Sequence, residues 1–254
     1  MFSSMLARIG IGSAEIDTVI ESIEAVPGGT LSGTVKIKGG STAQTVENIY
    51  LYIDTVAEVE AEEGEYRKTV TVGSTQIGSS FEIQPNEELD IPFSINLPWN
   101  IPINVLFGRE QDNVPLLLRS GLDISAAIDP KDTDPLWISP NPIQDKILQA
   151  CLDLGMRFKS TDVEYGHVTG SQSSFYQEIE FKPGKAFKGI KEVEITFVDD
   201  EHGMRVVVES DRKRKGMAAF FGGGSYDDIQ SLYYSHNESL NRDFKQDLLD
   251  LLLG

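Results

Sequence analysis

The segment VPGGTLSGTVKIKGGSTAQTVENIYLYIDT, residues 26–55, decides the fold that the sequence predicts. Between Gly29 and Gly39, apolar or small side chains alternate with polar ones, which is the period of a strand with one buried face. The same alternation resumes beyond Gly40, so the segment predicts two strands separated by a glycine-containing turn. The side chains that we assign to the buried faces are Leu31, Gly33, Val35, Ile37, Ile49, Leu51 and Ile53.

The glycines of this segment have a structural explanation. A strand that begins after Pro27 needs a positive φ in the preceding turn, and Gly28-Gly29 adopts it at least cost. Gly33 on the inward face indicates a close approach of the backbone or a bulge. A phosphate-binding loop would need G-x-G-x-x-G or G-x-x-x-x-G-K-[ST] between a strand and a helix, and the segment has neither spacing. We therefore interpret these glycines as a fold signature.

Short alternating segments recur on both sides of the middle of the chain. The strongest are residues 89–97, 177–181, 193–200 and 203–210. Residues 141–155 predict a capped helix, but helices do not otherwise alternate with strands, which disfavours a parallel α/β fold. The sequence therefore predicts an all-β chain of two tandem β-sandwich domains with a few helices, including a C-terminal helix.

The boundary between the domains is predicted in residues 129–142, DPKDTDPLWISPNP. Proline biases the preceding residue towards extended geometry, and we interpret this stretch as an extended linker. The domains would then be residues 1–131 and 132–254. Exposing the indole of Trp137 would forgo a large hydrophobic gain, so we expect this side chain to anchor the domain interface.

The tail from Ser225 onward is predicted to be helical, with Ser225 and Asp228 as a capping box. Its apolar stripe runs from Ile229 to Leu252 and must be covered, either by its own domain or by a second copy of the chain. A homo-oligomer that forms through the C-terminal helix is therefore one of the two interpretations.

Charge and cysteine content limit the classes of function. The chain has 254 residues, with 40 acidic and 22 basic side chains, for a net charge of −18. A nucleic-acid binder normally carries a basic face, so we expect no nucleic-acid partner. The single cysteine, Cys151, excludes an internal disulfide and favours a reducing cytoplasm. No stretch approaches the length of apolar residues that spans a membrane.

No catalytic constellation is recognisable in the sequence, and we predict that the chain is not an enzyme and takes no cofactor. Cys151 falls on the apolar stripe of a predicted helix, where packing is the better explanation. His236 is expected in a core or interface and His167 has no recognisable partner. His202 in the turn DDEHG, and the aspartates of residues 129–134, lack a full pattern of metal ligands. No metal site is predicted.

Three long stretches resemble the bacterial sporulation-control family of arrestin-like proteins. They are VPGGTLSGTVKIKGGSTAQTVENIYLYI, GLDISAAIDPKDTDPLWISPNPIQDKILQACLDLGMRF and YQEIEFKPGKAFKGIKEVEITFVDDEHGMRVVVESDRKRKGMAAFF. The resemblance covers most of the chain and implies two β-sandwiches arranged as in arrestins. It also implies a cytoplasmic regulatory or scaffolding role without known enzymatic activity, first associated with the onset of sporulation. The expected function is therefore that of an adaptor that acts by protein–protein binding.

One basic run stands out in this acidic chain, and it is the candidate partner-binding site. It is followed by two phenylalanines and a triple glycine; the residues are Arg212, Lys213, Arg214, Lys215, Phe220 and Phe221. Three interpretations stay open: neutralisation of acidic neighbours within the chain, contact with an acidic protein partner, or attachment to an anionic lipid surface. The last would make the chain a peripheral membrane module that uses residues 212–221.

Overall fold

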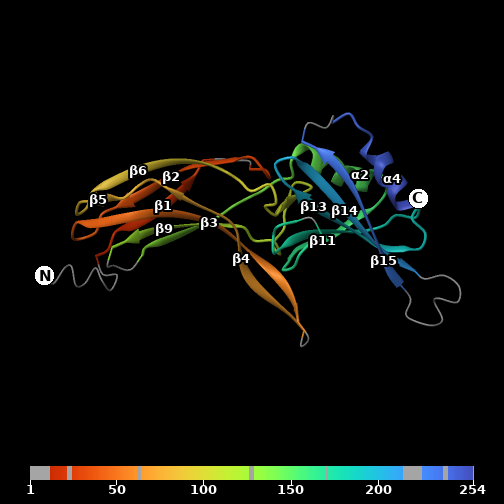
Figure 1. Cartoon of the computed structure of the whole chain (residues 1–254), viewed down its shortest axis with the longest axis horizontal. Helices are drawn as coiled ribbons and strands as arrows, with labels where there is room; N and C mark the ends of the chain where they lie inside the picture. Colours follow the sequence, from red (N-terminus) through yellow and green to blue (C-terminus); the bar gives the residue numbers. More distant parts are fainter. Residues whose placement is uncertain are drawn as a thin grey trace. The chain divides into compact units, whose positions relative to one another are not determined.

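The computed structural model describes residues 12–21, 25–61, 64–125, 129–169, 171–213, 225–236 and 240–253 (Figure 1). It confirms the predicted all-β class with a C-terminal helix. The strands of the first half are β1 (Glu15–Ile20), β2 (Thr30–Lys38), β3 (Gln44–Ala61), β4 (Gly64–Ile77), β5 (Phe81–Ile83), β6 (Glu88–Asn96), β7 (Val105–Leu106), β8 (Arg109–Glu110), β9 (Leu117–Ile124) and β10 (Lys131–Pro135). The remaining elements are α2 (Pro142–Asp153), β11 (Arg157–Glu164), β12 (Tyr176–Lys182), β13 (Ile190–Asp199), β14 (Gly203–Lys213), β15 (Ser225–Ser235) and α4 (Phe244–Leu253).

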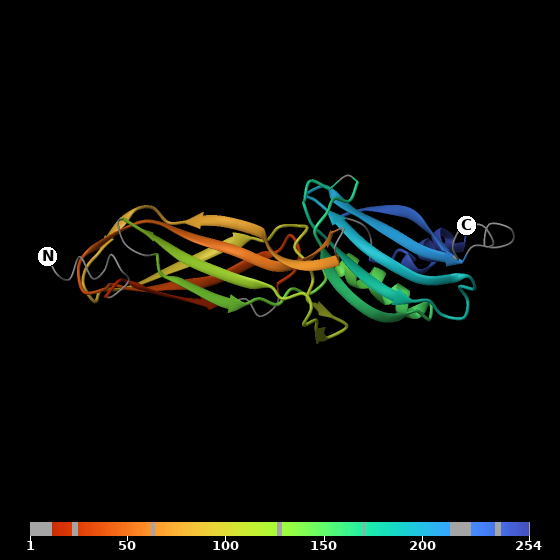
Figure 2. The same cartoon turned by 90° about the horizontal axis from the view of Figure 1, so that it is seen from below.

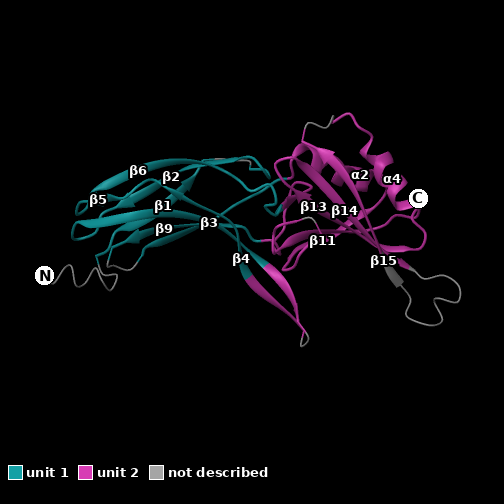
Figure 3. Ribbon diagram, viewed as in Figure 1, with its two compact units in different colours: residues 1–56, 69–104, 115–139 teal, residues 57–68, 105–114, 140–254 magenta. Residues whose placement is uncertain are grey.

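The chain divides into two compact units, coloured separately in Figure 3. Unit 1 comprises residues 1–56, 69–104 and 115–139, and unit 2 comprises residues 57–68, 105–114 and 140–254. The division along the chain therefore falls at Ser139/Pro140 instead of between residues 131 and 132. Two segments of the first half, the end of the β3–β4 hairpin and the β7–β8 hairpin, belong to unit 2. An alternating pattern identifies strands but does not reveal to which unit a hairpin belongs.

Unit 1 contains the strands predicted from residues 26–55. β2 lies between β1 and β6, and β3 pairs with β9, β5 and β4. Leu31, Val35 and Ile37 of β2 are buried, as the alternation predicts. Gly28 has φ +71, and a Cβ on Gly33 would lie 2.4 Å from the Val19 carbonyl oxygen. Both glycines are therefore required by backbone geometry, as expected.

The segment predicted to be a linker is partly a strand. Lys131–Pro135 forms β10, which pairs antiparallel with β9, so the linker interpretation is wrong for these residues. Extended geometry before proline suits an edge strand as well as a linker, and the sequence does not distinguish them. The Asp132 carboxylate accepts a hydrogen bond from the Thr18 N–H at 2.8 Å, which attaches β10 to β1.

Trp137 follows β10, and 45% of its surface is exposed to solvent. Leu136 and Ile138 on either side of it are buried. The indole is therefore only partly buried. Its role in a domain interface stays a prediction, and Leu136 and Ile138 are the side chains of this segment that contribute to the core of unit 1.

The predicted helix from Ser225 is also wrong in its first half. Ser225–Ser235 is the strand β15, paired antiparallel with β14 from Ser225 opposite Lys213 to Ser235 opposite Gly203. The spacing of Ile229, Leu232 and Tyr233 fits a helix, but pairing along the whole length of β14 overrides that preference. Within the described residues of this tail, the helix is α4, which begins at Phe244.

Unit 2 is built on the antiparallel sheet β11-β12-β13-β14-β15 (Figures 1 and 2). In its described part, α2, α4 and the β7–β8 hairpin pack on the inner face of this sheet. Phe107 contacts Phe158 and Phe181, with ring centroids 5.4 and 6.3 Å apart, and Tyr234 packs on Phe244 at 5.2 Å. Helices thus take much of the place that a second sheet has in unit 1.

The first turn of α2 begins as predicted. Asn141 is the N-cap, and its side chain accepts hydrogen bonds from the N–H groups of Ile143 and Gln144. Pro142 occupies the first turn and Gly155 follows the helix with φ +80. Cys151 is completely buried on the apolar stripe, and burial raises the pKa of its thiol to about 12. Its predicted packing role is confirmed.

Candidate binding surface of unit 2

The outer face of the unit 2 sheet, opposite the helices, is strongly acidic. Successive side chains of a strand point to opposite faces, so each strand contributes alternate residues to this surface. The carboxylates of the acidic face are Asp162 and Glu164 of β11, Glu178 and Glu180 of β12, Glu192 and Glu194 of β13, and Glu209 of β14. Apolar residues such as Ile179, Ile195 and Val208 occupy the inner face of the same strands and are buried.

The strand register places like charges directly opposite one another. Glu180 pairs with Glu194 across β12 and β13, and Glu194 pairs with Glu209 across β13 and β14. Asp162 pairs with Glu178 across β11 and β12. Like charges that face each other on neighbouring strands destabilise a sheet. This arrangement therefore carries a cost in stability.

One lysine compensates part of the acidic face. Lys159 forms ion pairs with Glu180 and Glu192. The hydrogen bonds that its ammonium group donates to these two carboxylates raise the pKa of Lys159 above its ordinary range. Burial alone would raise the pKa of Glu180, but the hydrogen bond from Lys159 and its other hydrogen bonds outweigh it, and that pKa is lowered.

Three carboxylates that form no ion pair with Lys159, namely Glu178, Glu164 and Asp162, have raised pKa values. Burial, followed by the negative charges of Glu194 and Asp162, raises the pKa of Glu178 to about 8. Burial and Asp162 raise the pKa of Glu164 to about 7. Burial and Glu180 raise the pKa of Asp162 to about 6. A cation brought to this face would therefore stabilise the charged forms of these carboxylates.

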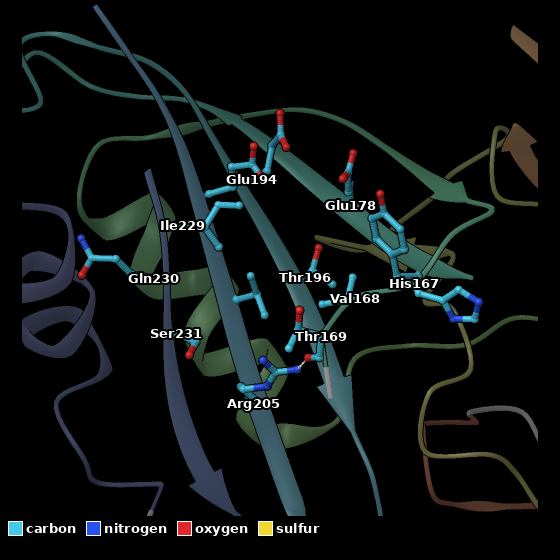
Figure 4. A pocket seen from close by; sticks show the side chains of 13 residues that line it. His167, Val168, Thr169, Glu178, Glu194, Thr196, Arg205, Ile229, Gln230 and Ser231 are labelled. Carbon is cyan, nitrogen blue, oxygen red and sulfur yellow. Dashed lines mark hydrogen bonds between the residues drawn. The ribbon is translucent and has the colours of Figure 1, made fainter. Parts of the chain in front are cut away.

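A pocket of about 440 Å³ opens on this face (Figure 4). Glu178 and Glu194 lie at one end, and Arg205 lies at the other, where its guanidinium donates to the Thr169 carbonyl. The wall is completed by Tyr176, Glu209, Thr196, Val207, Ile229, Gln230 and Ser231, together with the loop residues His167, Val168 and Thr169. The His167 ring nitrogen Nδ1 lies 2.8 Å from the Ser173 carbonyl oxygen, which ties that loop to the chain before β12.

Three of the carboxylates lie close enough to share one ion. Ligand oxygens of Asp162, Glu164 and Glu178 are all within 4.8 Å of one another. Exposed acidic groups often have this spacing without a bound metal, and their raised pKa values have the causes given above. We assign no metal to them.

The basic run predicted as the binding site lies only partly within the described residues. Arg212 contacts its own unit: its guanidinium pairs with the Asp228 carboxylate at 3.0 Å and donates to the Leu252 carbonyl at 2.9 Å. These bonds join β14 to β15 and α4, as the internal interpretation expects for this residue. Lys213 ends β14, while Arg214, Lys215, Phe220 and Phe221 lie outside the described residues, and their surface role stays a prediction.

The acidic face cannot be predicted from any one strand considered separately. The signal is present: carboxylates recur at alternate positions in β11, β12 and β13. It becomes visible only when the polar faces of successive antiparallel strands are considered together. The strand β11 was itself missed, and without it the pair formed by Asp162 and Glu178 could not be predicted.

The fold and this surface define the class: an all-β protein of two compact units, of which the second presents an acidic sheet face. The family model described as "SpoOM protein" matches residues 2–214. The sporulation-control protein Spo0M of Bacillus subtilis (strain 168) is 34% identical over 218 residues, which cover 85% of this chain and 82% of that protein. The crystal structure of Spo0M from Bacillus subtilis matches with a TM-score of 0.80 and 30% identity, over 95% of this chain and 98% of that one.

The chain therefore belongs to the Spo0M family, as the resemblance predicted. Neither of the helices in the described residues is long and apolar enough to cross a membrane.

Proposed function

We propose that this protein is a non-enzymatic, arrestin-like regulatory adaptor of the cytoplasm that takes part in sporulation control. It acts by binding a partner protein at the acidic face of unit 2. Membership of the Spo0M family and the printed name of the Bacillus relative, a sporulation-control protein, support the regulatory part of this proposal.

The observation that carries the binding part is the row of glutamates across β12, β13 and β14. Glu180, Glu194 and Glu209 lie opposite one another on adjacent strands, and like charges in this arrangement repel one another. A concentration of one sign of charge on a sheet face is complementary to an oppositely charged partner.

Complementation in Bacillus subtilis tests the proposal. A strain that lacks spo0M would receive this chain, the Bacillus protein, or an empty vector, and heat-resistant spores would be counted. We expect this chain to shift the spore count in the direction of the Bacillus protein. No shift, from a chain that accumulates in folded form, would contradict a role in sporulation control.

The role of the acidic face is tested in the same strain. Replacing Glu178, Glu194 and Glu209 together by glutamine should abolish the effect of the chain on the spore count. The matched control replaces three exposed carboxylates of unit 1, Glu15, Glu82 and Glu88, by glutamine and changes the net charge equally. Equal loss in both variants would remove the acidic face from the proposal.

A further inference from the structure

We propose that the pocket on the acidic face receives the lysine or arginine side chain of an extended basic segment of a partner protein. This inference rests on the proposed function and names the chemistry of its partner. It concerns the described residues of unit 2 alone.

The glutamate end of the pocket is suited to a cationic group. Glu178, Glu194 and Glu209 come from three adjacent strands and all line the same cavity. Burial, and after it the negative charges of Glu194 and other neighbouring carboxylates, raises the pKa of Glu178. An incoming ammonium or guanidinium group is attracted to these carboxylates and stabilises their charged forms.

The opposite end of the pocket gives the ligand an orientation. Arg205 is held there by its hydrogen bond to the Thr169 carbonyl (Figure 4). Its positive charge repels a cation, so the cationic group of a ligand is directed towards the glutamates. Arginine keeps its charge at every relevant pH, which makes this asymmetry permanent.

The apolar part of the surface fits the stem of a long side chain and its neighbours in a peptide. Val207 and Ile229 line the pocket beside the glutamates, and long basic side chains bury their methylene stems on apolar surface. Ile229 is 63% exposed and Tyr233, four residues further along β15, is 59% exposed. β15 ends the order of strands in the sheet, so an extended segment can lie along this margin and place alternate side chains on the face.

Charge complementarity favours this occupant over two others. A second copy of the chain would bring another net charge of −18 to an acidic surface. An anionic lipid headgroup would meet the same repulsion. A basic protein segment is attracted by the net negative charge at long range, and its side chain can enter the pocket at short range.

The direct test is fluorescence anisotropy with the whole chain and a labelled peptide that alternates lysine with valine. We expect saturable binding that weakens with salt, since exposed charges are screened over about 8–10 Å at physiological ionic strength. The same peptide with glutamine in place of lysine should bind at least about tenfold more weakly. Absence of any difference between the two peptides would overturn the inference.

Two variants separate the pocket from the overall negative charge. The triple variant Glu178→Gln, Glu194→Gln, Glu209→Gln should lose at least about tenfold in affinity. The charge-matched variant Glu15→Gln, Glu82→Gln, Glu88→Gln should bind like the natural chain. An equal loss of affinity in both variants would show that the peptide responds to the overall negative charge, and would overturn the proposal that it binds in the pocket. Circular dichroism checks that each variant is folded.

A third arm uses free spermidine, which carries the same cationic groups without a peptide. If spermidine displaces the labelled peptide at equal concentration, the pocket is a small-polyamine site and the proposed protein segment is wrong. These binding measurements use the isolated chain, whereas complementation measures spore counts in cells. Either test can fail while the other succeeds, so failure of this inference can be distinguished from failure of the proposed function.

Discussion

At the scale of single residues, Glu178 and Glu180 show how position decides the role of a carboxylate. They lie two residues apart on the same face of β12, but only Glu180 has Lys159 as a partner. The pKa of Glu178 is raised to about 8 by burial and neighbouring acids, whereas the pKa of Glu180 is lowered. One carboxylate therefore opposes folding when charged and the other supports it.

We predict that Glu178→Gln stabilises the chain at pH 8. Because the pKa of Glu178 is raised in the folded state, the folded protein binds this proton more tightly than the unfolded chain. That contribution to stability is complete below pH 4.5, the ordinary pKa, and is lost as the pH rises through 8. Glutamine resembles the protonated form, so the free energy of unfolding should rise by about 1–2 kcal/mol at pH 8, after allowance for solvent screening.

The matched control for this prediction is Glu180→Gln, which removes a partner of Lys159. It should lower the free energy of unfolding by about 1 kcal/mol at the same pH. Urea unfolding at pH 5 and pH 8 measures both effects, and the gain from Glu178→Gln should be smaller at pH 5. A loss of stability in both variants would mean that Glu178 has a favourable partner that this account overlooks.

Gly33 is a residue whose role the sequence predicted correctly. A Cβ there would lie 2.4 Å from the Val19 carbonyl oxygen and 2.7 Å from the ring of Phe93. We expect Gly33→Ala to cost about 1–3 kcal/mol, since the backbone of β1 or the ring must move. Gly121→Ala in β9 is the control: its nearest neighbour is 3.6 Å away, and it should be neutral or slightly stabilising. Thermal melting that ranks the two variants in the opposite order would contradict this.

At the scale of elements, the sequence predicted those whose signal is local. The alternation of β2, β3 and β6 and the capped start of α2 at Asn141 depend on neighbours along the chain. The predictions for β10 and β15 were wrong because these segments become strands by pairing with β9 and β14. A local sequence pattern does not show which strand a segment pairs with. The acidic face belongs to the same category, because its rows exist only once the strands are in register.

Arg212 of β14 contacts β15 and α4, and its replacement should destabilise α4. Its guanidinium bonds Asp228 of β15 and the Leu252 carbonyl of α4. We predict that Arg212→Met lowers stability by about 1–2 kcal/mol and increases amide hydrogen exchange in α4. Lys191→Met is the control, because its pair with Asp211 joins β13 to β14 within the sheet. This pair should contribute less than about 1 kcal/mol, and its loss should leave exchange in α4 unchanged. Unchanged exchange in α4 would leave Arg212 available for a partner, as the sequence alone allowed.

At the scale of the whole molecule, the boundaries of the units matter for how the chain can be divided. Residues 57–68 and 105–114 belong to unit 2, although they precede the boundary at Pro140. Two independent tandem domains would each keep a continuous sequence. Here, unit 2 is completed by segments from the first half, including Phe107 on Phe158 and Phe181.

We therefore predict that the chain cut between residues 139 and 140 stays in one piece. A protease site inserted there should yield two fragments that elute together in gel filtration. Residues 140–254 expressed alone should melt at lower temperature and bind a dye for apolar surface such as ANS, because the packing of Phe107 is missing. Two fragments that separate and each fold would contradict the assignment of these hairpins to unit 2.

The central claim is that the acidic face of unit 2 binds a basic protein segment. The most direct measurement is an NMR titration of the labelled chain with the peptide that alternates lysine with valine, with amide shifts mapped on the structure. The account predicts that the largest shifts cluster in β12, β13, β14 and β15 around Glu178, Glu194 and Glu209. Shifts spread evenly over both units, or concentrated on α2 and α4, would contradict it.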